Sequence, residues 1–127
     1  MQVIAARTLA VANDPNRSVT VTFGLPYEEP SGEWACPVVV DGNHLSARGV
    51  DAVQALQLAM TTARQALDAS GLPLVWSGME PGETGFPHVV PYAFGRFFSG
   101  KIERTIEQEI EWLGEVVREH NARQSKP

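Results

Sequence analysis

The hydrophobic and polar positions in the first part of the chain alternate in a way that is typical of β-strands. Residues 18–23 place valines and a phenylalanine on one face and hydroxyl side chains on the other, which is the pattern of a half-buried strand. Residues 2–12 are rich in Val, Ile, Ala and Leu and predict an earlier strand. The polar residues 13–17 between them indicate a turn, so the two strands should form a hairpin.

A second group of strands is expected after an exposed loop at residues 24–32. Residues 34–40 alternate again and predict a third strand. Its expected buried face consists of Trp34, Cys36, Val38 and Val40. Pro37 cannot donate a ladder hydrogen bond, so we expect this strand to lie at an edge of the sheet or to carry a bulge. Residues 44–50 predict a fourth, weaker strand, and residues 72–76 a short extended segment.

Two segments have the periodicity of amphipathic helices. The first begins at Asp51, which can form a capping box with Gln54, and ends at Gly71. Its expected apolar stripe consists of Val53, Leu56, Met60, Ala63 and Leu67. The second helix is expected from Ser99 to Asn121, before a frayed tail at residues 122–127. Its apolar stripe consists of Phe98, Ile102, Ile106, Ile110, Leu113, Val116 and Val117.

These elements predict a single α+β domain over residues 1–127. We expect a four- to five-stranded antiparallel sheet with two helices packed on one face. Residues 77–87, which are rich in Gly and Pro, predict a mobile loop between the helices. A chain of 127 residues with 43% hydrophobic side chains is long enough to bury one core.

Composition and charge exclude several classes of partner. The formal net charge of -5 argues against nucleic-acid binding, because phosphate contacts require a basic surface. No apolar run reaches the roughly 20 residues that span a bilayer, and the first residues do not have the pattern of a signal peptide. One cysteine cannot form an internal disulfide. We therefore expect a cytoplasmic protein without a membrane partner.

No motif predicts a catalytic residue, a metal site or a cofactor. Residues 95–101 match the G-x-x-x-x-G-K core of a phosphate-binding loop, but Ile102 replaces the Ser or Thr that would bind magnesium. The three histidines are far apart and have no companion cysteine pair. Thiol catalysis would need Cys36 with His88 as its base, and the neighbours of Cys36 favour a buried, quiet thiol instead. An alternative pocket in residues 77–92 would combine His88, Tyr92, Glu80 and Glu83.

Glutamates recur every four residues along the second predicted helix. This acidic ridge consists of Glu103, Glu107, Glu111, Glu115 and Glu119. Residues four apart are neighbours on a helix, so each adjacent pair of acids repels by a few tenths of a kcal/mol. The ridge is either a solvated face or a docking strip for a basic protein.

Two consecutive motifs carry a resemblance to a known group of proteins. W-x-C-P-x-x-V-x-G at residues 34–42 precedes G-V-D-A-x-Q-A-L-x-L-A at residues 49–59. Together they resemble a family of small bacterial proteins that share a domain of unknown function. The expected architecture is also similar to that of small α+β immunity proteins, which neutralise secreted toxins. That analogy concerns the fold and assigns no site.

For function, we expect a protein-binding module, of the bacterial immunity or antitoxin type. It would mask a basic partner protein through its acidic C-terminal helix. The first alternative is a small-molecule-binding or catalytic domain that uses residues 77–92. The second alternative is a structural homodimer in which the helix faces pair.

Overall fold

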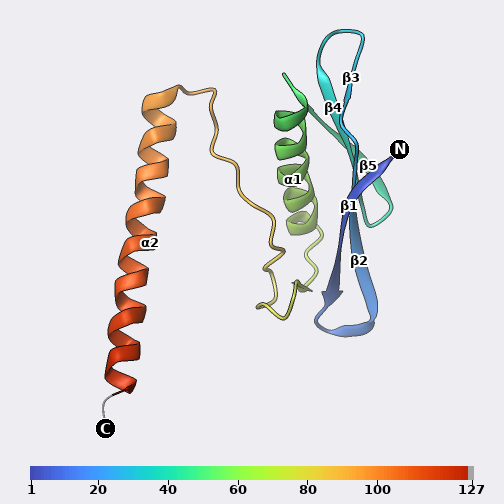
Figure 1. Cartoon of the computed structure of the whole chain (residues 1–127). Helices are drawn as coiled ribbons and strands as arrows, with labels where there is room; N and C mark the ends of the chain where they lie inside the picture. Colours follow the sequence, from blue (N-terminus) through green and yellow to red (C-terminus); the bar gives the residue numbers. More distant parts are fainter. Residues whose placement is uncertain (126–127) are drawn as a thin grey trace. The chain divides into compact units, whose positions relative to one another are not determined.

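A computed structural model describes residues 1–125, in which six strands and two helices follow one another (Figure 1). The strands are β1 (Val3–Val11), β2 (Asp14–Gly24), β3 (Tyr27–Glu28), β4 (Trp34–Val40), β5 (Asn43–Gly49) and β6 (Leu74–Val75). The helices are α1 (Ala52–Ala69) and α2 (Arg96–Gln124). The predicted α+β class is confirmed. The chain forms two compact units, Met1–Val89 with the sheet and α1, and Val90–Pro127 with α2. A single domain over the whole chain stays a prediction.

The sheet is antiparallel throughout, and β4 lies inside it. The strand order is β5–β4–β2–β1–β6. β5 pairs with one edge of β4, and both β2 and β3 pair with its other edge. The described sheet has six strands, one more than the predicted range of four to five. The additional strand is β3, which falls in the predicted loop and pairs with Trp34 and Ala35.

The first hairpin is longer than the sequence pattern indicates. β1 and β2 remain paired up to Val11 and Asp14, so the turn consists of Ala12 and Asn13. The predicted turn at residues 13–17 was too long. The end of the hairpin is exposed, so its polar side chains can be solvated while the two backbones stay paired.

Pro37 does not mark an edge strand. β5 pairs with β4 along its whole length, and β2 and β3 pair with the other side. The expected edge position was therefore wrong. Pro37 lies where the pairing passes from β2, at Phe23 and Val38, to β3, at Tyr27 and Ala35. This interruption accommodates a residue that has no backbone N–H to donate.

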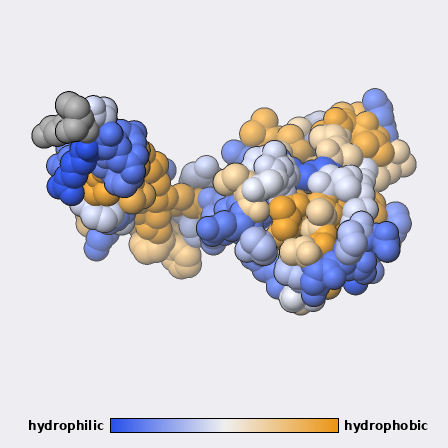
Figure 2. Space-filling model, turned by 90° about the horizontal axis from the view of Figure 1, so that it is seen from below, coloured by the Kyte–Doolittle hydropathy of each residue, from blue (hydrophilic) through white to orange (hydrophobic). Residues whose placement is uncertain are grey.

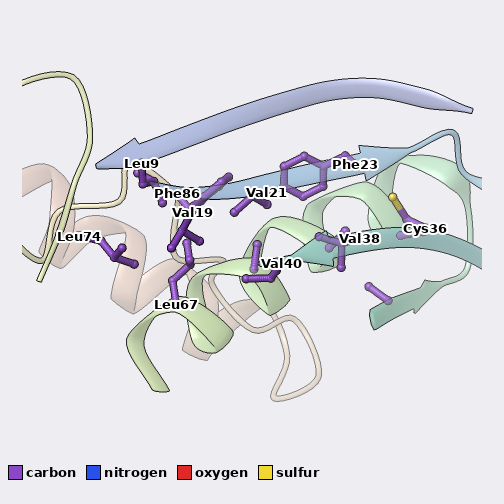
Figure 3. Packing of buried hydrophobic residues seen from close by; sticks show 14 of the residues in the cluster. Leu9, Val19, Val21, Phe23, Cys36, Val38, Val40, Leu67, Leu74 and Phe86 are labelled. Carbon is purple, nitrogen blue, oxygen red and sulfur yellow. The ribbon is translucent and has the colours of Figure 1, made fainter. Parts of the chain in front are cut away.

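The hydrophobic core lies between the sheet and α1 (Figure 3). It includes three of the four residues predicted for the buried face of β4, and Trp34 packs partly buried against them. The fully or almost fully buried residues from the strands of the sheet include Leu9, Val19, Val21, Phe23, Cys36, Val38, Val40 and Leu74. α1 covers this face by packing on β4 and β5 (Figure 1). Packing of a second helix on the same face stays a prediction, because α2 belongs to the other unit.

α1 begins and ends as the sequence predicts. The carboxylate of Asp51 accepts a hydrogen bond from the backbone N–H of Gln54 at 2.8 Å, and the Gln54 side chain accepts one from Val50 at 2.7 Å. Gly71 ends the helix with a φ of 69°, the left-handed conformation that glycine adopts easily. The buried face differs from the prediction, because Val53 is 66% exposed. The buried residues of α1 are Ala55, Ala59, Ala63 and Leu67, of which the last two belong to the predicted stripe.

Two arginines fix the segment that follows β6. The Arg7 side chain donates to the Thr84 carbonyl oxygen at 3.1 Å, and its guanidinium carbon lies 4.4 Å from the Trp76 ring centroid and 4.5 Å from that of Phe86. Arg64 of α1 donates to the Phe86 carbonyl oxygen at 3.2 Å. The Phe86 ring also meets Phe23 edge to face. The predicted mobile loop is therefore anchored to the core at its second half.

Replacement of Asp51 tests the helix cap. Asp51→Ala should lower the free energy of unfolding by about 1 kcal/mol, because the Gln54 N–H loses its acceptor. Urea unfolding of both proteins measures the difference. Gln57→Ala, at an exposed position of the same helix, is the control and should change stability by less than about 0.5 kcal/mol.

Glycine substitutions test the anchored segment. Gly85 and Gly82 both have positive φ, but a Cβ at Gly85 would lie 2.4 Å from the Trp76 ring, whereas Gly82 has open space around it. Gly82→Ala should cost about 1 kcal/mol from backbone strain alone, and Gly85→Ala about 3 kcal/mol because overlap is added. Equal losses in thermal unfolding of the two variants would contradict the packing of Trp76 on Gly85.

Candidate functional site

The helix α2 consists mostly of residues that are exposed within the second unit. Gly95 precedes it with a φ of 92° and no side-chain cap, and the Phe94 and Phe98 rings meet edge to face at 5.3 Å. The helix starts at Arg96 instead of Ser99 and continues to Gln124, so the predicted fraying from residue 122 was wrong for residues 122–124. Residues 126 and 127 of the predicted tail lie outside the described residues. At roughly 1.5 Å per residue, α2 is about 44 Å long.

One side of α2 is apolar, and the described residues of its own unit leave most of this side exposed. Exposed fractions are 47% at Ile106, 64% at Ile110, 51% at Leu113 and 55% at Val117. The complete apolar stripe is the predicted one, namely Phe98, Ile102, Ile106, Ile110, Leu113, Val116 and Val117. Seen end-on, the helix has hydrophobic and hydrophilic residues on different sides (Figure 2). An amphipathic helix gains most of its stability by packing its apolar face, so this surface is suited to a binding contact.

The acidic ridge follows another side of the same helix. Arg96 donates to both carboxylate oxygens of Glu103, at 2.9 and 3.2 Å, so this acid already has a cation. The other four, Glu107, Glu111, Glu115 and Glu119, are exposed. Within residues 1–125 the ion pairs give none of these four a cationic partner. The ridge therefore has unneutralised charge available at its surface.

The residues of the predicted alternative pocket occupy different surroundings. His88 lines a cavity of about 280 Å³ together with residues of α1, namely Thr61, Arg64, Gln65 and Asp68. Glu83 accepts a hydrogen bond from the Gly85 N–H at 2.8 Å and so stabilises its own loop. Glu80 is exposed in that loop, and Tyr92, 60% exposed, belongs to the other unit. A joint site of these four residues stays a prediction.

A larger cavity in the first unit was not predicted. It measures about 460 Å³ and lies between the β4–β5 turn and the end of α1. Its lining is Val19, Val40, Asp41, Asn43, His44, Leu45, Ala66, Leu67, Ser70 and Leu72. Arg17 forms an ion pair with Asp41 at 3.4 Å at the rim. The polar turn next to His44 can be identified in the sequence. The residues around it do not indicate that the end of α1 lies opposite this turn.

Cys36 is buried in the core, and its thiol points at the backbone carbonyl oxygen of Gly24. Its exposed fraction is 0%, and its Sγ donates to the Gly24 carbonyl oxygen at 3.4 Å. Burial raises the pKa of the Cys36 thiol above its ordinary value. His88, the base required for thiol catalysis, is exposed and close to the carbonyl oxygen of its neighbour Val89. Among residues 1–125, burial sets the pKa of this thiol and raises it, whereas an activated nucleophile needs an electropositive setting that lowers it.

Residues 1–125 contain no group of three or more His, Cys, Asp or Glu side chains that could hold a metal ion. Neither described helix combines the length and apolar character needed to cross a membrane.

Thiol labelling tests the burial of Cys36. The native protein should react slowly with a thiol reagent near neutral pH, because the raised pKa keeps the thiol protonated and the core excludes the reagent. Denaturant should expose it to fast labelling. Reaction in the native state at the rate of a free cysteine would show that the thiol is accessible and would restore thiol catalysis as a function.

The first compact unit matches a known protein-family model. A family model described as Domain of unknown function (DUF6968) matches residues 5–88, which include both motifs of the sequence analysis and exclude α2. Searches among curated proteins and among solved structures found no match. The matched region covers nearly all of the first compact unit and more than half of the chain. The chain therefore belongs to the DUF6968 family of domains of unknown function.

Proposed function

We propose that this protein is a cytoplasmic protein-binding module that docks a basic protein on the acidic ridge of α2. The observation that carries the proposal is the row of exposed glutamates without cationic partners among residues 1–125, at Glu107, Glu111, Glu115 and Glu119. A bacterial immunity or antitoxin-type protein would work in this way, by covering the active surface of its target.

The electrostatics of the ridge favour a bound state. Each pair of glutamates four residues apart destabilises the free helix slightly, and a basic partner converts this repulsion into attraction. The net charge of -5 adds a long-range field that speeds the approach of a cationic protein. Surface charges of this kind act mainly on the association rate and lose their effect as salt rises.

Small-molecule binding is a second candidate, favoured by the cavity of about 460 Å³ in the first unit. Its volume lies within the range of ligand pockets, and its walls combine apolar residues with His44, Asn43 and Ser70. This cavity lies in the region that the family model matches, whereas the acidic ridge lies outside it. The two functions can therefore be tested separately.

Neutralising the middle of the ridge tests the docking proposal. Glu107→Gln with Glu111→Gln should leave stability unchanged or raise it by a few tenths of a kcal/mol, because the three pairs of neighbouring glutamates that contain these residues no longer repel. Captured proteins from bacterial lysate are identified by mass spectrometry, and the binding of the purified partner is then measured kinetically. The double variant should bind the basic partner more slowly, with a weaker dependence on salt.

A matched control separates the ridge from total charge. Glu28→Gln with Glu80→Gln removes the same two charges from exposed positions of the first unit. This control should retain the wild-type association rate and salt dependence. Equal association rates for all three proteins, at low and at high salt, would show that the ridge is only a solvated face.

A further inference from the structure

We propose that the cavity of about 460 Å³ in the first unit binds a small organic cation, an ammonium group on an apolar body, and that Asp41 selects the charge. This inference rests on the second candidate function, small-molecule binding in that cavity, and names the class of ligand. It is independent of α2 and of the acidic ridge, because every lining residue belongs to the first unit.

The cavity forms because α1 lies very close to the sheet at one end only. At the start of the helix, a Cβ at Gly49 would lie 2.6 Å from the backbone nitrogen of Ala55. Toward the other end, Ala66 and Leu67 of α1 and the turn between β4 and β5 line the cavity from its two sides. The helix and the sheet therefore diverge along α1 and leave a space that the side chains of residues 1–89 do not fill.

The walls of the cavity are mainly apolar. Leu45 lies directly across the β4–β5 pair from Val38, so both side chains are on the sheet face that α1 covers. Val38 is fully buried, but Leu45 is 37% exposed because the cavity lies over it. The apolar lining residues are Val19, Val40, Leu45, Ala66, Leu67 and Leu72, of which Val19, Val40 and Leu67 gather at this end of the core (Figure 3). An apolar ligand body would remove this surface from water.

The polar groups with a fixed hydrogen-bonding role are acceptors. The Ser70 hydroxyl donates its proton to the Leu67 carbonyl oxygen at 2.6 Å, so toward a ligand it can only accept. An ionised carboxylate such as that of Asp41 also only accepts. The Asn43 amide can turn either its oxygen or its nitrogen toward a ligand. A ligand that donates hydrogen bonds suits this set, and an ammonium group carries only donors.

Two sources of negative potential lie on opposite sides of the cavity. On the sheet side, the ion pair of Asp41 with Arg17 is long, at 3.4 Å, and nearly half of each side chain is exposed, so it compensates the carboxylate only in part. On the helix side, α1 ends without a basic residue in its last turn, so the partial negative charge of its C-terminal end is not offset there. None of the ten lining residues is a lysine or an arginine. A cation is therefore favoured over a neutral or anionic molecule of the same shape.

Three probes of similar shape test the charge preference in the full chain. Phenylbutylamine carries a positive charge, phenylbutanol no charge and phenylbutyrate a negative charge. In an NMR titration, the bound probe should shift the methyl signals of Leu45, Leu67 and Leu72 in the cavity wall. The amine should bind about tenfold more tightly than the alcohol, because attraction by Asp41 and by the end of α1 adds to the shared apolar contact. The acid should bind most weakly.

Two substitutions at the rim should act in opposite directions. Asp41→Asn should weaken amine binding about fivefold and leave alcohol binding unchanged, because one carboxylate charge is removed. The turn should persist, since Asp41 has a φ of 50°, which asparagine adopts readily. Arg17→Gln should strengthen amine binding about twofold, because it releases the carboxylate from its ion pair. Glu28→Gln is the matched control and should change neither affinity, because β3 pairs with the end of β4 that is remote from Asp41.

Filling the cavity shows where the probes bind. Ala66→Leu should abolish the binding of all three probes, because the larger side chain occupies the space, and thermal unfolding verifies that the variant is folded. If it is not folded, the opposite effects of Asp41→Asn and Arg17→Gln still decide the charge preference. Equal affinities for amine and alcohol would overturn the cation and leave small-molecule binding intact. Failure of every probe to bind would overturn both, and amine binding that survives in folded Ala66→Leu would place the amine outside the cavity and overturn the inference.

Discussion

The close approach of α1 to the sheet is the constraint on which the first unit depends. A Cβ at Gly49, the last residue of β5, would lie 2.6 Å from the backbone nitrogen of Ala55. Ala55, Ala59 and Ala63 are fully buried along this contact. Small side chains on the helix and none on the strand end allow the two backbones to pack closely. The strand therefore passes into the helix through a short connection, which Asp51 caps.

Local patterns predicted most of the fold. The alternation of β2, a hairpin between β1 and β2 and the capping box at Asp51 depend on residues close in the sequence, and each is present, although the hairpin turn is two residues long and not the predicted five. The internal position of β4, the pairing of β3 and the exposure of Val53 were missed. These features depend on which distant segment lies alongside, because a strand with Pro37 is tolerated inside the sheet only where β2 gives way to β3. Periodicity in one segment contains no such information.

The candidate sites differ in the same way, because some depend on local sequence and others on contacts between distant segments. The acidic ridge and the apolar stripe of α2 follow from helical periodicity alone, so both could be identified by their residues. The cavity near His44 joins the β4–β5 turn to Ser70 at the end of α1, and the surroundings of His88 are likewise set by α1. Such sites arise when distant segments meet. A single sequence shows which residue types are present but not which of them lie close together in the fold.

α2 differs from the rest of the chain because the core is complete without it. All members of the buried hydrophobic cluster lie between Leu9 and Phe86, within the first unit, and the family match ends at residue 88. In the described residues 1–125, Glu103 is the one acid of the ridge that forms an ion pair. A helix that carries two surfaces of opposite chemistry is suited to two kinds of contact. Salt should weaken the contact of the acidic ridge and leave the apolar contact largely intact, because screening acts on exposed charges and not on buried apolar area.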